Sequence, residues 1–142
     1  MPTIICLGSD KVLSDMVGVL VGDKLKQLGI KTFVFGDSCH TVELKNLEFL
    51  LSKIQNKNIL YIDSGISKNK GNIFFCPDGI RLKNGKKYSG ASICAGTIYL
   101  ENNKIMLANT SYRNIVKYVE IIVQSIINYA NFITQLNKYS KF

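Results

Sequence analysis

The apolar and polar residues of the chain alternate between short apolar runs and longer amphipathic segments. Residues 3–7 are dense in β-branched and apolar side chains without alternation, which is typical of a strand buried on both faces of a parallel sheet. Gly8 ends this run. In the next segment the apolar residues Val17, Leu20, Val21, Leu25 and Leu28 recur at helical spacing. We expect Ser14 or Asp15 to cap this helix and Gly29 to end it, so the first unit is strand, loop, helix.

The same rhythm continues through the next two units. Strands are predicted near residues 31–36 and 58–63, and residues 42–54 between them have apolar positions along one helical face. This βαβαβ order predicts parallel strands joined by right-handed crossovers. Because the strand near residues 3–8 is apolar on both faces, we expect it to lie between the other two.

The rhythm changes after Asp63. Residues 72–76 predict a strand reached without a full intervening helix, and the polar segment 80–90 predicts a surface excursion. A hairpin is expected from strands at 91–100 and 105–108 joined by a turn at 101–104, which gives the parallel sheet an antiparallel extension. A final helix, with Thr110 or Ser111 as its cap, would place six apolar residues on one face: Ile115, Val119, Ile122, Ile126, Tyr129 and Ile133.

Length, charge and cysteine usage narrow the classes of function. A chain of 142 residues suits one domain, expected at residues 1–136 with a tail at 137–142. No run is long enough to span a bilayer and no signal peptide is recognised, so we expect a cytoplasmic protein that binds no membrane. The net charge is +8, but only two of 18 basic residues are arginine, which argues against nucleic acid. The four cysteines form no C-x-x-C pair, which disfavours zinc and disulfide roles.

Aspartates follow each of the three predicted parallel strands, where the crevice of an open α/β sheet lies. Asp10 and Asp15 follow the first strand, Asp37 the second and Asp63 the third. Asp10 and Asp37 are more often turn or helix-cap residues in such positions. For Asp15 a helix-cap role and a functional role are about equally supported. Asp63 directly follows an apolar strand, where a carboxylate is costly unless chemistry uses it. His40, the only histidine, is either a polar surface residue or a base.

Two glycines on the first predicted helix, Gly18 and Gly22, lie four residues apart and form one smooth stripe. Glycine in a helix interior costs about 0.5 to 1 kcal/mol relative to alanine, so the pair needs a reason. We expect the helix backbone to approach a neighbouring strand or loop closely there. The loop before this helix lacks the glycine and lysine spacing of a P-loop, and G-x-G-x-x-G is absent, so a nucleotide site is unsupported.

The segment 6–25, CLGSDKVLSDMVGVLVGDKL, resembles the YyaC-type sporulation proteins, which are related to germination protease and the hydrogenase maturation proteases. The residues that carry the resemblance are Gly8, Asp10, Asp15, Gly18, Gly22, Lys24 and Leu25, then 34–36, Val42, Asn46, Leu47 and 62–63. The resemblance implies a three-layer α/β/α sandwich with a mainly parallel twisted sheet. It also implies that Asp15 and Asp63 bind a divalent metal of a substrate protein.

The chain departs from the family pattern at two positions: Glu43 stands where a histidine is expected, and Ala91 where an acid is expected. Our leading hypothesis is a sporulation-associated protein of spore-forming bacteria with a peptidase-type fold, cytoplasmic or in the forespore, that cleaves or formerly cleaved a protein or peptide substrate. Asp15 and Asp63 would be catalytic, and the one candidate cofactor is a divalent metal. Asp10, Asp37, His40 and Glu43 would contact substrate. The alternative is an inactive binding module that uses the same crevice and residues 83–90, and a small-molecule or nucleotide hydrolase is a third, weaker reading.

Overall fold

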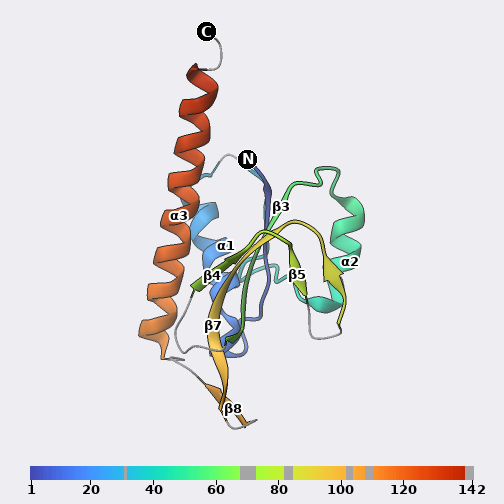
Figure 1. Cartoon of the computed structure of the whole chain (residues 1–142), viewed down its shortest axis with the longest axis vertical. Coiled ribbons are helices and arrows are strands. Elements are labelled where there is room, and N and C mark those ends of the chain that lie inside the picture. Colours follow the sequence, from blue (N-terminus) through green and yellow to red (C-terminus); the bar gives the residue numbers. More distant parts are fainter. Residues whose placement is uncertain (31, 68–72, 82–84, 102–103, 108–110, 140–142) are drawn as a thin grey trace.

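The computed structural model describes residues 1–30, 32–67, 73–81, 85–101, 104–107 and 111–139. Its centre is a sheet of strand order β2-β1-β3-β7-β4, in which β8 also pairs with β7 (Figure 1). The strands are β1 (Thr3–Cys6), β2 (Val34–Phe35), β3 (Ile59–Ser67), β4 (Ile73–Cys76), β7 (Ala91–Glu101) and β8 (Lys104–Leu107). β1, β2, β3 and β7 run parallel, whereas β4 and β8 run antiparallel to β7.

The predicted centre of the parallel sheet is confirmed, because β1 pairs with β2 on one side and with β3 on the other. All four residues of β1 are buried, as its two-sided apolar character requires. The strand predicted at residues 91–100 is confirmed as β7, but it joins β3 in parallel as well as carrying the antiparallel strands. Residue 72 of the predicted strand at 72–76 and residues 102–103 of the predicted turn lie outside the described residues.

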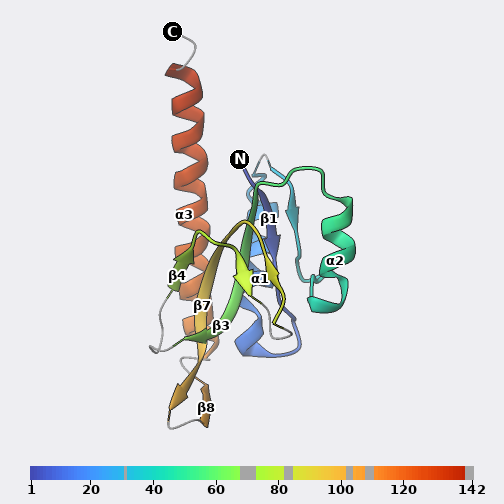
Figure 2. The same cartoon turned by 45° about the vertical axis from the view of Figure 1, so that its right-hand side comes forward.

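Side chains of β1 and of the residue that follows it point alternately into two cores, one on each face of the sheet. Ile4 and Cys6 join a cluster with residues of α1 (Val17–Gln27) and α3 (Tyr112–Tyr139). Ile5 and Leu7 join a second cluster that includes Leu47 of α2 (Leu44–Lys53). Figures 1 and 2 show α1 and α3 on one side of the sheet and α2 on the other. The predicted three-layer α/β/α sandwich is confirmed.

The start of α1 differs from the prediction. Neither Ser14 nor Asp15 caps the helix: both belong to a short 3-10 turn, η1 (Leu13–Asp15), and the N-cap residue is Met16, which makes no side-chain capping bond. The turn runs into the helix without the extended residue that a side-chain cap needs. At the other end, Gly29 stops the helix with a φ of 65°, as expected for a left-handed residue after the last turn.

The expectation for Gly18 and Gly22 is confirmed by the backbone around them. A Cβ atom on Gly18 would lie closer than 3.0 Å to the carbonyl oxygen of Leu7, and one on Gly22 equally close to that of Gly36. Real Cβ atoms essentially never approach backbone oxygens so closely. The two glycines therefore let α1 lie directly against the ends of β1 and β2.

The segment at residues 80–90 is more than the surface excursion that its polar sequence suggested. It carries a two-stranded sheet of β5 (Ile80–Arg81) and β6 (Lys87–Tyr88), and Ile80 is buried in the second core. Lys86 and the Tyr88 hydroxyl both hydrogen-bond Glu48 of α2. The Lys86 ammonium is the main cause that lowers the pKa of Glu48. The sequence predicted only a surface excursion because Ile80 and Tyr88, which attach this segment to the second core, are separated by polar residues in the sequence.

The last helix, α3, projects beyond the rest of the protein. It runs to Tyr139, past the boundary predicted at residue 136, and its C-terminal turns rise beyond the rest of the chain (Figure 1). Ser111 accepts a hydrogen bond from the Asn114 backbone N–H, as the predicted cap would, whereas Thr110 lies outside the described residues. No helix of the described segments is both long and apolar enough to cross a membrane.

Candidate active site

Three of the acidic residues singled out in the sequence line one pocket of about 360 Å³ where β1 ends. Its lining is Leu7, Gly8, Asp15, Glu43, Leu44, Lys45, Asp63 and Ser64. Two of these acids, Asp15 and Asp63, are the residues expected to be catalytic, and Glu43 is one of those expected to contact substrate. The carboxyl edge of the sheet therefore gathers carboxylates as the parallel topology predicts.

Asp15 reaches the pocket through the tight turn that follows β1. Gly8 has a φ of 150°, and a Cβ atom there would collide with the Asp15 carbonyl oxygen. That oxygen accepts a hydrogen bond from the Ser9 N–H at 3.1 Å, and the Asp15 N–H donates to the Val12 carbonyl at 2.9 Å. The turn is thus closed on itself, and only glycine fits at its base.

A second support for this turn comes from β7, far along the chain. The Thr97 hydroxyl is buried and donates to the Ser14 carbonyl at 2.7 Å. Thr97 is the extra residue of a β-bulge, because Gly65 pairs with Gly96 while the next residue, Ile66, pairs with Ile98. Bulges re-aim side chains near functional sites, and here the bulge anchors the residue that precedes Asp15. Sequence reasoning did not find Thr97, since neither the bulge nor the contact has a local signal.

Asp63 lies beside the end of β1, but it does not end its own strand as the sequence suggested. Cys6 pairs with Ile62, and β3 then continues to Ser67 along β7. The strand extends because β7 offers a longer partner than β1 does. The partner of Asp63 on β7 is Cys94, whose thiol pKa is raised to about 12, first by burial and then by the negative charge of Asp63.

The residue after Asp63 adds a further polar group to the pocket that the sequence analysis missed. The Ser64 N–H donates to Asp63 Oδ1 at 2.8 Å and fixes that carboxylate against the backbone. The Ser64 Oγ atom is buried and has no hydrogen-bond partner among the described residues. A buried hydroxyl without a partner is costly, so this unsatisfied group is a feature of the fold that calls for a function.

Glu43 arrives at the pocket on the first turn of α2. An isolated parallel bridge joins Leu7 to Val42, and the Gly8 N–H donates to the Val42 carbonyl at 3.0 Å. Asn46 Oδ1 accepts the Glu43 N–H at 2.7 Å and so holds the start of the helix. The Glu43 carboxylate lies 3.6 Å from Lys45 Nζ, which partly offsets its charge. Among the described residues, the lining of the pocket holds three carboxylates and one ammonium.

The other expected contact residues do not line this pocket. Asp10 is exposed in the loop after β1. Asp37 orders the loop after β2, because its carboxylate accepts bonds from Lys26 Nζ at 2.6 Å and from the backbone N–H groups of Cys39 and His40. The His40 side chain is 90% exposed. A substrate contact by Asp10, Asp37 or His40 stays a prediction, and it would need a substrate that extends beyond the pocket.

The Asp37 contacts give a pH-dependent contribution to stability. The hydrogen bond from Lys26 is the main cause that lowers the pKa of Asp37 below 3.8. A carboxyl group whose pKa is lower in the folded state stabilises the protein at pH values above its unfolded-state pKa. This stabilisation is lost as the pH falls through the folded-state pKa. We expect Asp37→Asn to lower the free energy of unfolding by about 0.5 to 1 kcal/mol at pH 7, with the difference from wild type shrinking below about pH 4. Urea unfolding across pH checks this, with the exposed Asp78→Asn as control; a pH-independent difference would contradict it.

The position at which the family pattern has an acid, Ala91, lies away from the pocket. It pairs with Leu60, three residues before Asp63 along β3, and it lines a separate apolar pocket. The missing carboxylate at residue 91 therefore removes nothing from the group formed by Asp15, Asp63 and Glu43.

The donor set also bears on the expected divalent metal. Among the described residues, no group of three or more His, Cys, Asp or Glu side chains is placed to hold a metal ion. Asp15 and Asp63 could supply two ligands, and the remaining ligands would come from water or from a substrate. We therefore derive no step through a resident metal.

A hollow larger than this pocket, about 980 Å³, lies elsewhere, along the groove between α1 and α3. Its lining mixes apolar residues such as Leu20, Leu28 and Ile121 with scattered polar ones. It contains neither Asp15 nor Asp63, so size alone does not mark the site in this fold.

Comparison with solved structures identifies the class of fold. The chain is similar to the NiFe hydrogenase maturation protease HycI from Thermococcus kodakarensis KOD1, with a TM-score of 0.58 and 14% identity over 91% of each chain. It is also similar to the NiFe hydrogenase maturation protease HybD from Thermococcus kodakarensis, with a TM-score of 0.50 and 17% identity over 87% of this chain and 98% of that one. The architecture is therefore the peptidase-type α/β fold of these proteins.

The family is shown by the sequence itself. Residues 2–135 match the family model described as "Protein of unknown function (DUF1256)", and the chain belongs to that family. No curated protein matches the chain.

Proposed function

We propose that this chain is a peptidase that acts on a protein or peptide substrate, with Asp15 and Asp63 as its reacting carboxylates. The observation that carries the proposal is the shared pocket, which brings together two acids that are 48 positions apart in the sequence. The peptidase-type fold supports it, because the pocket lies at the carboxyl end of β1, beside Asp63 within β3, and open α/β sheets place their ligands at the carboxyl ends of their strands.

In this proposal the two carboxylates share the work of hydrolysis. One accepts a proton from a water molecule as the water attacks the peptide carbonyl, and the other donates a proton to the leaving amine. Two carboxylates in different surroundings can divide the roles of base and acid in this way. The Ser64 hydroxyl could donate to the substrate, and Glu43 and Lys45 could bind its polar groups at the mouth of the pocket.

The resemblance to YyaC-type sporulation proteins adds a cellular setting to the proposal. On this basis we propose that the protein acts in the cytoplasm or forespore of a spore-forming bacterium. The resemblance to the maturation proteases adds that a substrate-borne divalent metal could complete its coordination with Asp15 and Asp63. A divalent ion that raises the melting temperature of wild type but not of the Asp15→Asn variant would support the second addition.

The test compares variants of equal charge change inside and outside the pocket. Wild type, Asp15→Asn, Asp63→Asn and the control Asp78→Asn, an exposed acid outside the pocket, are incubated with an unfolded-protein library, and new peptide ends are identified by mass spectrometry. We expect cleavage by wild type and Asp78→Asn and a loss of at least about 100-fold in the other two. Both pocket variants should keep or slightly gain stability, because a carboxylate kept for chemistry is not kept for the fold.

The competing function is a binding module of the same fold. It is favoured by the contacts that tie β5 and β6 to α2, because Lys86, Tyr88 and Glu48 make a firm surface beside the mouth of the pocket. No cleavage by wild type, together with clear destabilisation of both pocket variants, would overturn the peptidase proposal and leave the binding module.

A further inference from the structure

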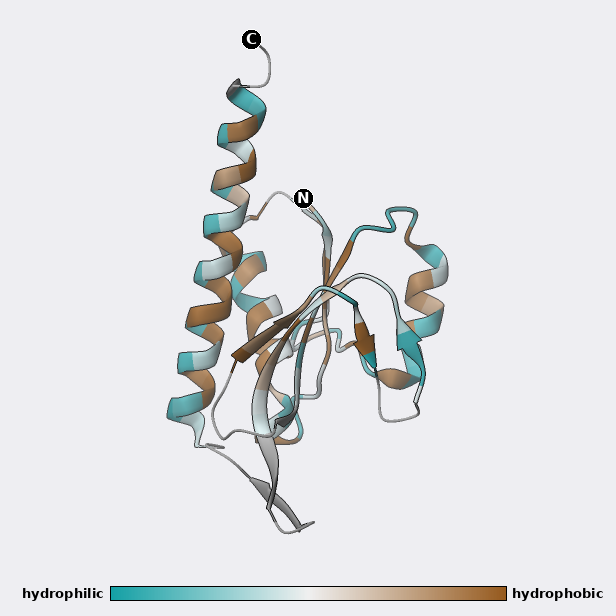
Figure 3. Ribbon diagram, in the orientation of Figure 1, coloured by the Kyte–Doolittle hydropathy of each residue, from teal (hydrophilic) through white to brown (hydrophobic). Residues whose placement is uncertain are grey.

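One apolar seam runs along the whole of α3, but the rest of the chain covers only its first half. Its members recur at alternating spacings of four and three residues, the pattern of a heptad repeat. They are Ile115, Val119, Ile122, Ile126, Tyr129, Ile133 and Leu136. The first four are buried against α1 and the sheet, whereas Tyr129 and Leu136 are 47% and 48% exposed. Figure 3 shows apolar residues continuing along the part of α3 that rises beyond the body.

This projecting half of α3 carries no charge before Lys138 in its last turn. No Asp, Glu, Lys or Arg occurs between Glu120 and Lys138, although charged residues make up 20% of the chain. A helix that stays in solvent normally presents charged side chains, whereas the cores of protein interfaces lack charge and are rich in aromatic residues. Tyr129 and the 55% exposed Phe132 supply that aromatic character. An interfacial membrane helix would instead carry lysine or arginine on its polar face.

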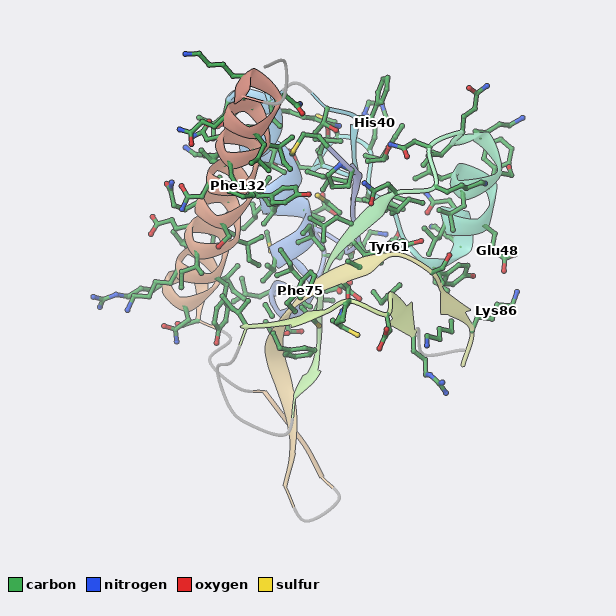
Figure 4. The ribbon with its side chains drawn as sticks, turned by 45° about the horizontal axis from the view of Figure 1, so that its top comes forward. His40, Glu48, Tyr61, Phe75, Lys86 and Phe132 are labelled. Carbon is green, nitrogen blue, oxygen red and sulfur yellow. The ribbon has the colours of Figure 1, made fainter. Side chains whose placement is uncertain are left out.

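At the foot of the projecting half lies an apolar pocket of about 300 Å³. Ile126 and Tyr129 of α3 form one wall, and Met1 and Phe75 are among the residues on the other side. Phe75 is 63% exposed, and Figure 4 marks it on β4 and Phe132 on α3. The pocket and the seam share Ile126 and Tyr129, and the seam continues from them along the helix to Leu136.

We propose that the occupant of this surface is a second copy of the chain, whose α3 packs antiparallel along the exposed seam. The charge of +8 on each copy opposes association, and this repulsion is smallest where the two surfaces that meet carry no charge, as along this seam. The seam needs a partner with the same apolar spacing, and α3 itself has that spacing. A twofold axis would make the contact self-complementary and closed.

The direction of the pair follows from the position of the body. The exposed half of the seam lies on the same helical face that packs against α1 and the sheet. In a parallel pair the two bodies would compete for the space between the helices. In an antiparallel pair they lie at opposite ends, and a crossing near Asn131 brings Leu136 of one copy to the pocket beside Ile126 of the other.

Sedimentation equilibrium of the full chain tests this proposal between about 1 and 100 µM, where a dimer with a Kd of about 10 µM would form. We expect wild type to pass from 15.9 kDa to twice that mass. Ile133→Glu with Leu136→Glu should stay monomeric. Asn131→Glu with Gln135→Glu adds the same two charges to the opposite face of the helix and should behave as wild type. Thermal unfolding checks that both variants stay folded, as expected for changes on an exposed half-helix.

Three results would overturn the proposal. They are a wild type that stays monomeric throughout, an equal loss of dimer in both double variants, and binding of wild type to anionic phospholipid vesicles without dimer formation. Small-angle scattering of the dimer should show two separated bodies, and a single compact particle would contradict the antiparallel arrangement.

Discussion

Replacing Gly18 or Gly22 with leucine is expected to lower the free energy of unfolding by about 3 kcal/mol or more, or the melting temperature by roughly 10 °C. The cause is the absence of room for any side chain. A Cβ atom on Gly18 would already collide with the carbonyl oxygen of Leu7, and one on Gly22 with that of Gly36. These obstacles are backbone atoms of the central sheet and of the loop after β2, so they cannot move aside as a flexible side chain would. The helix would have to separate from the sheet, and α3 packs on that helix.

Gly29→Ala is the matched control for this experiment. A Cβ atom there meets nothing within 4 Å, and only the positive φ of 65° opposes it. That strain should cost about 1 to 2 kcal/mol, clearly less than the collisions at the helix interior. Differential scanning calorimetry gives both values. A Gly18→Leu or Gly22→Leu variant that melts at or above the temperature of Gly29→Ala would contradict the close approach of α1.

The arrangement of the sheet was predictable because apolar residues recur in the sequence at the same spacing as buried positions recur in strands and helices. The two-sided apolar run at residues 3–7 requires a central strand, and the glycines of α1 require a close neighbour. Features that depend on a single tertiary contact were not predictable. The anchoring of Ile80 and Tyr88 beside α2 and the missing cap of α1 belong to this group, since their local sequences favour a loop and a capped helix respectively.

The candidate site was predicted in outline for a similar reason. Parallel topology alone brings Asp15 and Asp63 to one edge of the sheet. Glu43 was identified as a candidate because it stands where the resembled family is expected to have a histidine. The sequence does not show how far apart two residues lie along that edge. It therefore did not separate Asp37 and His40, which lie outside the pocket, from the residues that line it. Ser64 was missed because a serine beside an aspartate has no distinctive pattern, and its unpaired buried hydroxyl appears only in the fold.

The support that β7 gives to the Asp15 turn leads to the other large expected effect. Thr97→Val keeps the size and β-branching of the side chain but removes the hydroxyl that donates to the Ser14 carbonyl. A buried carbonyl that loses its donor costs about 1 to 3 kcal/mol, so urea unfolding should show a loss of that size. Thr97→Ser keeps the hydroxyl and should retain most of the stability.

Hydrogen exchange separates loss of this anchor from a general loss of packing. In Thr97→Val, amides of residues 9–16 should exchange faster than in wild type by more than the change in global stability accounts for, because η1 opens locally. Thr134→Val removes a hydroxyl that bonds the Ala130 carbonyl on the exposed part of α3, and it should leave exchange at residues 9–16 unchanged. If Thr97→Val matched wild type in both stability and exchange, the bulge of β7 would not be what holds Asp15 at the pocket. If only global stability fell, Thr97 would support the core rather than the site.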